Sequence, residues 1–413
     1  MSSSSFGLAA LDGLLEDALI FEVPLPRLAQ YLKAKRSSAG NVFRSANTVS
    51  GGNIDLSGST MGFYSIIPVV AGKNVMVISA DSNYSYFSLA QPEASLNLSG
   101  NSNLVSIFYA VSLADFLDVG LGVNQNNNGL DARMTGIDSC VRFSPSKSLS
   151  IEYNAFKSGL INSAKIEYGQ DIFAAPANGE QLNNSVSIFY ESSSNLKFTG
   201  LFENNNCQQD ANMVVSDERY TYVCVGRDTA FGSIGVVLGD DQLNFKCDLL
   251  ASETKLASSS GIFASMSPDM VLDGESIDKT ADLSLRMAAR GLRLGVNKAI
   301  NDRVKLGFDF SFLKLIFAGD AKVWDSFFFG LVRKLDSAYA APLESADVAT
   351  IDLGARYQIS RDSELKYSFK QLIPISVVNK GPSGTDSNSN YDVVSDSAMS
   401  GGNTQTLAMT WYF

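Results

Sequence analysis

Apolar and polar side chains alternate along several stretches of this chain, and the longest of these stretches constrain its fold most. Residues 304–312 carry Val, Leu or Phe at every second position, with Lys, Gly, Asp and Ser between them, and residues 351–359 alternate in a similar way. A β-strand directs alternate side chains to opposite faces, so each stretch predicts a strand with one apolar and one polar face. About nine residues is also the length that a tilted strand needs to cross a bilayer. We therefore expect strands that span a membrane.

The C-terminal stretch, residues 403–413, shows the same alternation. Leu407, Met409, Trp411 and Phe413 occupy one parity, and the residues between them are mostly small or polar. Aromatic side chains at a strand end are typical of the membrane interface in transmembrane barrels, whose last strand must pair with the first. We predict that these four residues form a membrane-insertion signature through which the barrel-assembly machinery binds the last strand.

Composition excludes several other classes of protein. Charged residues make up 18% of the 413 residues, against about 25% in an average soluble domain. No apolar run approaches the roughly 18 residues of a spanning helix. The net charge of −11 argues against a nucleic-acid partner. The chain has no histidine, which removes Ser-His and Cys-His nucleophile pairs and histidine metal sites. We expect no enzymatic activity, no cofactor and no bound metal.

The N-terminal part differs from the rest. Leu8, Leu11 and Leu15 recur at helical spacing with acidic residues between them, and Pro24 ends this pattern. It lacks the basic start of a secretory signal peptide. A signal that is absent from this version of the chain, a start that lies upstream and an organellar barrel all remain open.

We divide the chain into residues 1–50, an N-terminal helical segment, and residues 51–413, a transmembrane β-barrel. The segment either packs across one end of the barrel or acts as a plug or hatch in its lumen.

Short and long connections alternate along the barrel part, which is typical of outer-membrane barrels. The short connections are residues 144–147, 192–195, 239–242, 301–303 and 360–363. The long polar connections, some with strand-like pieces, are residues 124–131, 158–184, 203–218, 254–279, 318–346 and 379–403. At about 25 residues for each strand and connection, we expect an all-β antiparallel barrel of about 14 strands, within a range of about 12 to 16. A parity change between residues 283–287 and 292–296 predicts a bulge or tight turn between them.

Charged residues on the non-lipid parity are candidates for the lining of a pore, where acids and bases set the ion preference. They are Glu152, Lys246, Asp248, Arg286, Lys305, Asp309, Asp352, Arg356 and Lys366. Alternatively, these residues only form ion pairs with one another and keep the inner wall hydrated.

Four cysteines are present, and none belongs to a CxxC pair. Cys247 lies on an apolar parity and reads as a small buried or lipid-facing side chain. Cys207 and Cys224 flank a polar stretch, so either a disulfide between them or two free thiols is compatible with the sequence.

The final Phe, with apolar residues at alternate positions before it, resembles the signature of bacterial outer-membrane β-barrels, and residues 53–413 are porin-like. The chain is also similar to the long-chain fatty acid transporter family. Residues 39–44 resemble part of that family's hatch, and the hairpin 104–124 resembles one of its hairpins, but residues 45–47 read Ser-Ala-Asn where the family has Asn-Pro-Ala. This resemblance implies fourteen strands, an N-terminal hatch and uptake of hydrophobic molecules.

We predict an outer-membrane channel of a Gram-negative bacterium for passive diffusion of small polar solutes through a charged lumen. Two alternatives remain open: a plugged barrel that takes up hydrophobic molecules such as long-chain fatty acids, and a structural or adhesin-like barrel with a filled interior. A mitochondrial barrel fits the terminal Phe and the long connections less well. The expected partners are outer-membrane lipid, small solutes and the barrel-assembly machinery, and a homo-oligomer is compatible with the sequence.

Overall fold

The computed structural model describes most of the barrel part and two residues of the segment before it. The described residues are Leu28, Leu32, 39–51, 54–70, 73–90, 95–127, 133–168, 171–216, 219–264, 278–327, 332–379 and 399–412. Within them, no helix has the length and apolar character of a membrane span.

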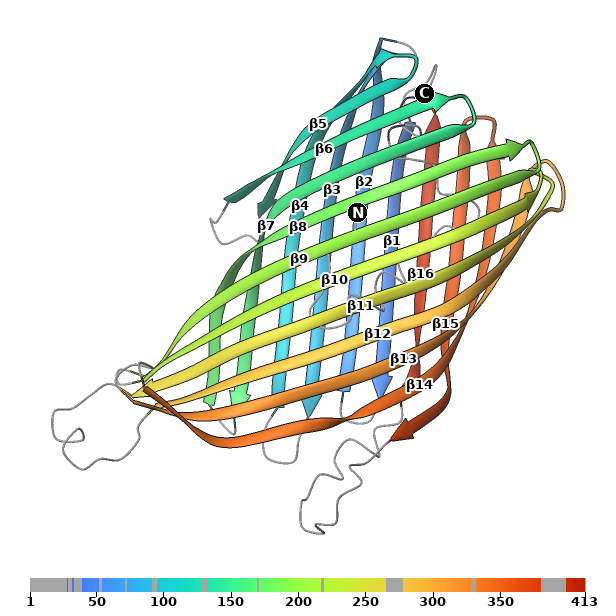
Figure 1. Cartoon of the computed structure of the whole chain (residues 1–413). Coiled ribbons are helices and arrows are strands. Elements are labelled where there is room, and N and C mark those ends of the chain that lie inside the picture. Colours follow the sequence, from blue (N-terminus) through green and yellow to red (C-terminus); the bar gives the residue numbers. More distant parts are fainter. Residues whose placement is uncertain are drawn as a thin grey trace.

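The described residues form sixteen strands, each hydrogen-bonded to its neighbours in an antiparallel closed barrel (Figure 1). The strands are β1 Ala39–Gly51, β2 Ile54–Val70, β3 Asn74–Ala90, β4 Ser95–Ala114, β5 Leu117–Asn127, β6 Arg133–Ser146, β7 Leu149–Tyr168, β8 Asp171–Ser193, β9 Leu196–Ser216, β10 Arg219–Gly239, β11 Leu243–Ala264, β12 Asp278–Ala299, β13 Val304–Phe327, β14 Val332–Ser360, β15 Ser363–Asn379 and β16 Met399–Tyr412. The all-β antiparallel barrel is as expected, and its strand number lies at the upper end of the expected range.

Strand β1 corrects the boundary of the N-terminal segment. Ala39 pairs with Tyr412 of β16, and the pairing continues to the other end of β1. Residues 39–50 are therefore barrel wall, and the hatch that residues 39–44 suggested is wrong. The physical reason is closure: the last strand needs a partner, because an open sheet edge has unpaired backbone groups that lipid cannot satisfy. The helix expected before residue 28 lies outside the described residues, and the division into segment and barrel otherwise stays a prediction.

The short connections that the sequence indicated join consecutive strands at one end of the barrel, which we call the short-turn end. The turn after β10 shows which local interactions stabilise such a short connection. Gly239 has a φ of 116°, which favours glycine. Asp240 Oδ1 accepts hydrogen bonds from the backbone N–H groups of Gln242, at 2.8 Å, and Leu243, at 3.0 Å. These bonds to its charged form lower the pKa of Asp240.

The long connections are shorter than the sequence indicated. Of the expected link 158–184, all but residues 169–170 belong to β7 and β8, which remain paired up to Tyr168 and Asp171. The strands thus continue beyond their apolar stretches. Polar residues follow on both parities there, because a barrel wall that leaves the membrane has water on both sides. Because apolar and polar residues no longer alternate there, the sequence alone indicates loops at these strand ends.

One part of the wall has an extra pairing. The hairpin β5–β6 is short, and beyond its end β4 pairs directly with β7, from Ser95 with Glu167 to Ser99 with Ser163. The expected hairpin 104–124 is present as β4 and β5.

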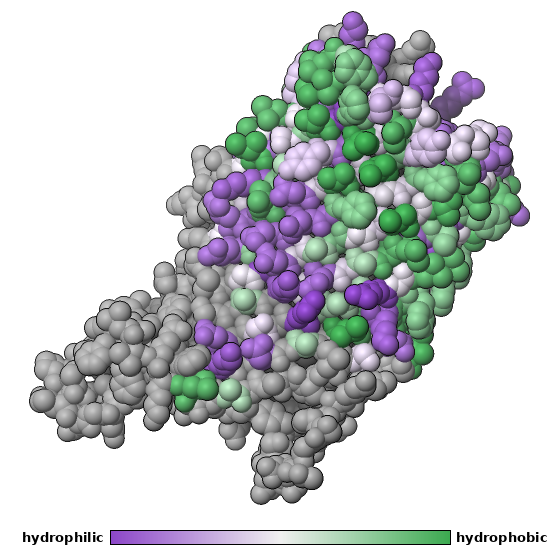
Figure 2. All heavy atoms as spheres, viewed as in Figure 1, coloured by the Kyte–Doolittle hydropathy of each residue, from purple (hydrophilic) through white to green (hydrophobic). Residues whose placement is uncertain are grey.

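The outer face of the barrel carries a belt of exposed apolar side chains, and the inner face is mostly polar. On β13, Leu306, Phe308, Phe310 and Phe312 are exposed. The residues between them, among them Asp309, are buried. Figure 2 shows apolar residues over the short-turn side of the visible face, with hydrophilic residues gathered farther along the same strands. Polar groups inside and apolar groups outside are the reverse of a soluble protein, and they indicate contact with lipid.

The expected bulge in β12 is absent. Pairing of β12 with β11 and β13 runs without a register shift from Lys279 to Lys298. Leu292 and Leu294 face outward in the belt, whereas Ala289 is buried on the inner face. The apolar parity changes along this strand because the surroundings change from lipid to water, while the backbone continues regularly.

The disulfide between Cys207 and Cys224 is not formed. Cys207 is a free, buried thiol. It pairs in register with Arg227, three positions from Cys224 along β10. Three positions correspond to about 10 Å along a strand, which is beyond the reach of a disulfide. Cys247 is also a free thiol, half-buried on the outward parity of β11.

We predict that Phe310→Arg destabilises the folded barrel by about 2–4 kcal/mol, because it places a charge in the lipid-facing belt. Asp320→Arg is the matched control, since Asp320 is exposed on the same face of β13 outside the belt. It should change stability by less than about 0.5 kcal/mol. Urea-induced unfolding from lipid vesicles measures both. Equal effects of the two substitutions would contradict the position of the belt.

Candidate functional site: the lumen wall and the docked N-terminal segment

Eight of the nine charged residues expected to line a pore lie on the inward parity of their strands. Glu152, Asp248, Asp309, Asp352 and Lys366 are buried there, and Lys246, Lys305 and Arg356 are half-buried there. Whether they act on a solute stays a prediction.

Arg286 is the exception, and its assignment to the lumen is wrong. It is exposed on the outer face, and its Nε lies 2.8 Å from Glu253 Oε1. The sequence misleads here because the lipid-facing parity was read from apolar residues 283–287, which lie beyond the belt. Outside the membrane, an apolar parity no longer marks the outer face.

Two ion-paired groups lie on the inner wall near the short-turn end. In the first, Asp248 Oδ2 accepts from Arg293 at 2.7 Å and 2.9 Å and lies 3.2 Å from Lys246 Nζ. In the second, Glu364 contacts Arg356, and Lys366 Nζ lies 3.3 Å from Glu364 Oε1.

Sequence reasoning missed Arg293 and Glu364. Both lie on the inward parity of strands in which the sequence had already indicated a charged lining residue or an apolar outer face. On the opposite wall it also missed Asp118, whose Oδ2 accepts from Arg142 Nε at 2.6 Å. For Arg293 and Asp118 the signal was present as a charge between apolar neighbours, whereas Glu364 lies between Ser363 and Leu365. Their pairing could not be foreseen, because it depends on the register between strands.

Glycines on neighbouring strands make room for the inward carboxylates. A Cβ on Gly235 would lie 2.0 Å from Asp248 Oδ1, and one on Gly295 would lie 2.0 Å from Asp309 Oδ1. Each glycine is in register with the carboxylate that it accommodates. The two acids therefore lie flat against the wall.

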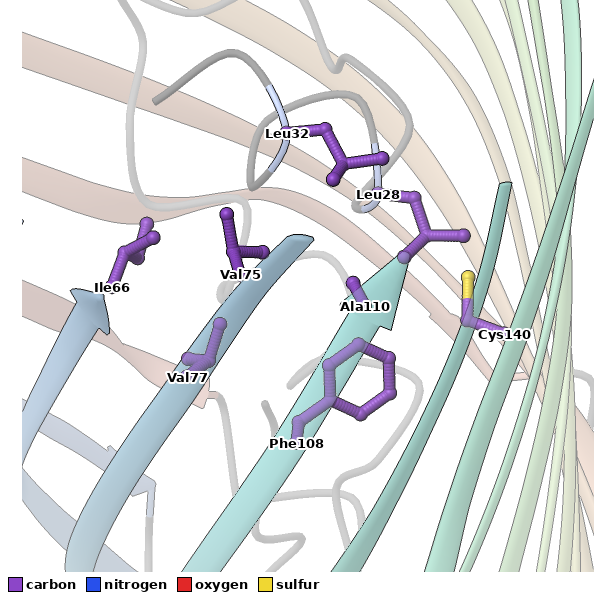
Figure 3. Packing of buried hydrophobic residues seen from close by; sticks show 8 residues of the cluster. All are labelled: Leu28, Leu32, Ile66, Val75, Val77, Phe108, Ala110 and Cys140. Atoms are coloured by element: carbon purple, nitrogen blue, oxygen red, sulfur yellow. The ribbon is translucent and has the colours of Figure 1, made fainter. Parts of the chain in front are cut away.

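The described part of the N-terminal segment lies inside the barrel. Leu28 and Leu32 are buried against inward-facing apolar residues near the short-turn end (Figure 3). We call this group the docking cluster; it consists of Leu28, Leu32, Ile66, Val75, Val77, Phe108, Ala110 and Cys140. The wall residues come from β2, β3, β4 and β6.

A polar contact fixes the same segment. The backbone N–H of Leu28 donates to Glu152 Oε2 at 2.8 Å, and Glu152 is fully buried. A hydrogen bond to a buried carboxylate contributes about 1.5–3 kcal/mol. Gly120 provides the space beside it, since a Cβ there would lie 2.2 Å from Phe108 Cζ and 3.1 Å from Leu28 Cδ2.

A second apolar group faces the lumen from the opposite wall, on β11 to β15. We call it the second apolar cluster; it consists of Leu250, Ala289, Leu313, Leu315, Val348 and Leu372, with Phe231 packed against it. On β13, Asp309 is followed on the inward parity by Ser311, Leu313 and Leu315. The cluster thus lies on the far side of the ion-paired groups from the short-turn end.

No family model and no curated protein matches the chain. Among solved structures, the chain is similar to the CymD monoaromatic hydrocarbon channel, with 9% identity, a TM-score of 0.41 and coverage of 94% of this chain and 91% of that chain. It is similar to the Ralstonia pickettii toluene transporter TbuX, with 10% identity, a TM-score of 0.41 and coverage of 91% and 89%. It is also similar to the translocator domain of the autotransporter NalP from Neisseria meningitidis, with 8% identity, a TM-score of 0.34 and coverage of 98% and 97%.

At these identities and TM-scores, the similarity says nothing about what this chain carries. The barrel's own geometry decides its class: the wall is closed, the belt faces lipid and the inner face is polar. The last strand closes the wall with Leu407 and Met409 exposed on its outer face. The fold is that of an outer-membrane β-barrel, as the sequence predicted. The insertion role of Leu407, Met409 and Trp411 stays a prediction, and Phe413 lies outside the described residues.

We predict that loosening the docked segment exposes Cys140, which is 1% exposed in the docking cluster. In a background without the other cysteines, Leu28→Ala should speed maleimide labelling of Cys140 at least about tenfold, because a large-to-small change costs about 2–5 kcal/mol in such a cluster. Glu152→Gln should act in the same direction. Leu306→Ala, on the outer face, is the control. Unchanged labelling in both lumen variants would show that Leu28 does not cover Cys140.

Proposed function

We propose that this barrel takes up small hydrophobic molecules across the outer membrane and that its N-terminal segment holds the lumen closed at the short-turn end. The observation that carries the proposal is Leu28, which is fully buried on an apolar inner wall and is hydrogen-bonded to Glu152. This function is the alternative that the sequence left open, and we favour it over diffusion of polar solutes.

The character of the inner wall supports this choice. A pore for polar solutes is lined along its length by groups that hydrate or coordinate them. Here the inner wall is mostly polar, but two apolar clusters interrupt it in separate regions. Sites for hydrophobic ligands are mostly apolar with a few placed polar groups, and apolar contact contributes about 25 cal/mol for each Å² removed from water.

The order of these features along the wall suggests a route. A molecule that enters from the end opposite the short turns meets the second apolar cluster, around Leu313 and Leu315, before it reaches the level of Asp248 and Asp309. Release at the short-turn end then requires the segment at Leu28 to move away from the wall. The driving force is the concentration gradient of the molecule, and no chemical step is needed.

A channel for polar solutes is the second candidate, and the ion-paired groups around Asp248 and Glu364 favour it. Their charges would give the lumen a field that selects ions. Each of these acids, however, already contacts two basic side chains of the wall. Charges compensated in this way hold the wall together and leave less attraction for a passing ion.

We predict that Leu315→Gln weakens binding of an apolar naphthylamine dye to the refolded protein by about tenfold, because one buried apolar side chain is worth about 1.5–3 kcal/mol. Dye fluorescence in detergent micelles measures the affinity. Lys246→Gln is the matched lumen control, since it alters the ion-paired level and leaves the second apolar cluster unchanged. Dye affinity should stay the same in that variant.

Planar-bilayer recording separates the two candidates. Hydrophobic uptake through a closed lumen predicts no steady conductance in the intact chain. Our proposal would be rejected in favour of the polar channel by two results together. These are steady ohmic steps whose conductance falls in Lys246→Gln, and a dye affinity that is unchanged in Leu315→Gln.

A further inference from the structure

The outer wall carries two pairs of basic residues beyond the last apolar row of the belt, on β11, β12 and β13. The last apolar row consists of Leu249, Leu292 and Phe312, which are in register on the three strands and exposed. The next outward row, two residues farther from the short-turn end, contains Arg290 and Lys314 directly opposite each other. The step between outward rows is about 7 Å, so this pair lies at the level where lipid headgroups meet the belt.

The second basic pair lies farther along the same strands. Lys255 and Arg286 are also directly opposite each other. Their side chains are 64% and 61% exposed, and Glu253 lies between them, 3.5 Å from Lys255 Nζ and 2.8 Å from Arg286 Nε. This pair therefore has an acidic partner of its own.

The pair nearer the belt has no such partner. Among residues whose side chains the structure describes, none forms an ion pair with Arg290 or Lys314, and both are exposed. Asp347 is in register with Lys314 on β14, so the row carries two positive charges and one negative. Elsewhere at the edge of the belt, Lys157 has Glu180 at 2.8 Å.

Like charges directly opposite each other on a sheet destabilise it. An anion between Arg290 and Lys314 would remove this repulsion. Arginine and lysine are the residues that bind phosphate most strongly, arginine through its planar fork. The small neighbours Ala251 and Ala288, in register with Arg290 and Glu253, leave space for a bulky group.

We propose that Arg290 and Lys314 bind the phosphate of a membrane lipid in the leaflet nearer the long connections, with the lipid's acyl chains on the row of Leu249, Leu292 and Phe312. The lipid site lies on the outer face and is independent of the uptake proposed for the lumen. Basic residues near an anionic lipid surface each gain attraction that salt weakens.

The experiment uses the full chain in a non-ionic detergent and counts retained lipid by native mass spectrometry. The probes are bisphosphorylated lipid A, the same glycolipid without phosphate, phosphatidylglycerol and inorganic phosphate. Arg290→Gln with Lys314→Gln should lower retention of the phosphorylated lipids at least about tenfold. Retention of the dephosphorylated glycolipid should not change. The matched control is Lys157→Gln, which removes an outward lysine that already has an acidic partner.

A second measurement guards against a variant that simply folds poorly. In detergent without lipid, the double variant should unfold at the same urea concentration as the unaltered protein or at a higher one, because a like-charge pair has been removed. Added phosphorylated lipid should then stabilise the unaltered protein more than the variant. Equal retention in both proteins, an equal loss in Lys157→Gln, or tight binding of inorganic phosphate alone would overturn the proposal.

Discussion

Lipid cannot hydrogen-bond to a peptide group, and the rest of this structure follows from that constraint. Every strand that crosses the membrane needs a partner on both sides, so the sheet closes when β1 pairs with β16 along its length. Closure then separates two surfaces with opposite requirements. The outer surface buries apolar side chains in lipid, and the inner surface collects the polar ones, which must pair with one another or with water. The ion-paired groups around Asp248 and Glu364 are the result of that second requirement.

The same constraint explains a pattern that is easy to misread. The strands run beyond the belt into water, where neither face is required to be apolar. There the outer face becomes polar, as Arg286 and Lys314 show, while the inner face can become apolar, as Leu313 and Leu315 show. Apolar residues thus move to the other parity along one continuous strand, and β12 does so without a bulge. Leu28, in contrast, docks on inward apolar residues within the belt itself, where Ile107 and Tyr109 are exposed on the outer face.

The sequence predicted what periodicity can report, namely the strand class, the short turns and the inward position of most of the charged residues. The sequence-based prediction failed where the position of a residue depends on neighbouring strands or on the membrane. Residues 39–44 are a wall strand because Tyr412 and its strand need a partner, which no local pattern shows. Arg286 was misplaced because parity was read without knowing where the membrane ends. The contact of Leu28 with Glu152 joins residues 124 positions apart, and only the closed barrel brings them together.

The central claim is that one parity of each strand faces lipid within the belt and water beyond it. Spin labels placed one at a time along β13, from Leu306 to Lys322, test it most directly in lipid vesicles, by collision with oxygen dissolved in lipid and with a water-soluble nickel complex. We predict that oxygen collisions peak at every second residue, Phe308 and Phe310 among them, and that the nickel complex reaches the same parity from Lys314 onward. A period near 3.6 residues, or oxygen peaks at Asp309 and Ser311 instead, would contradict the account.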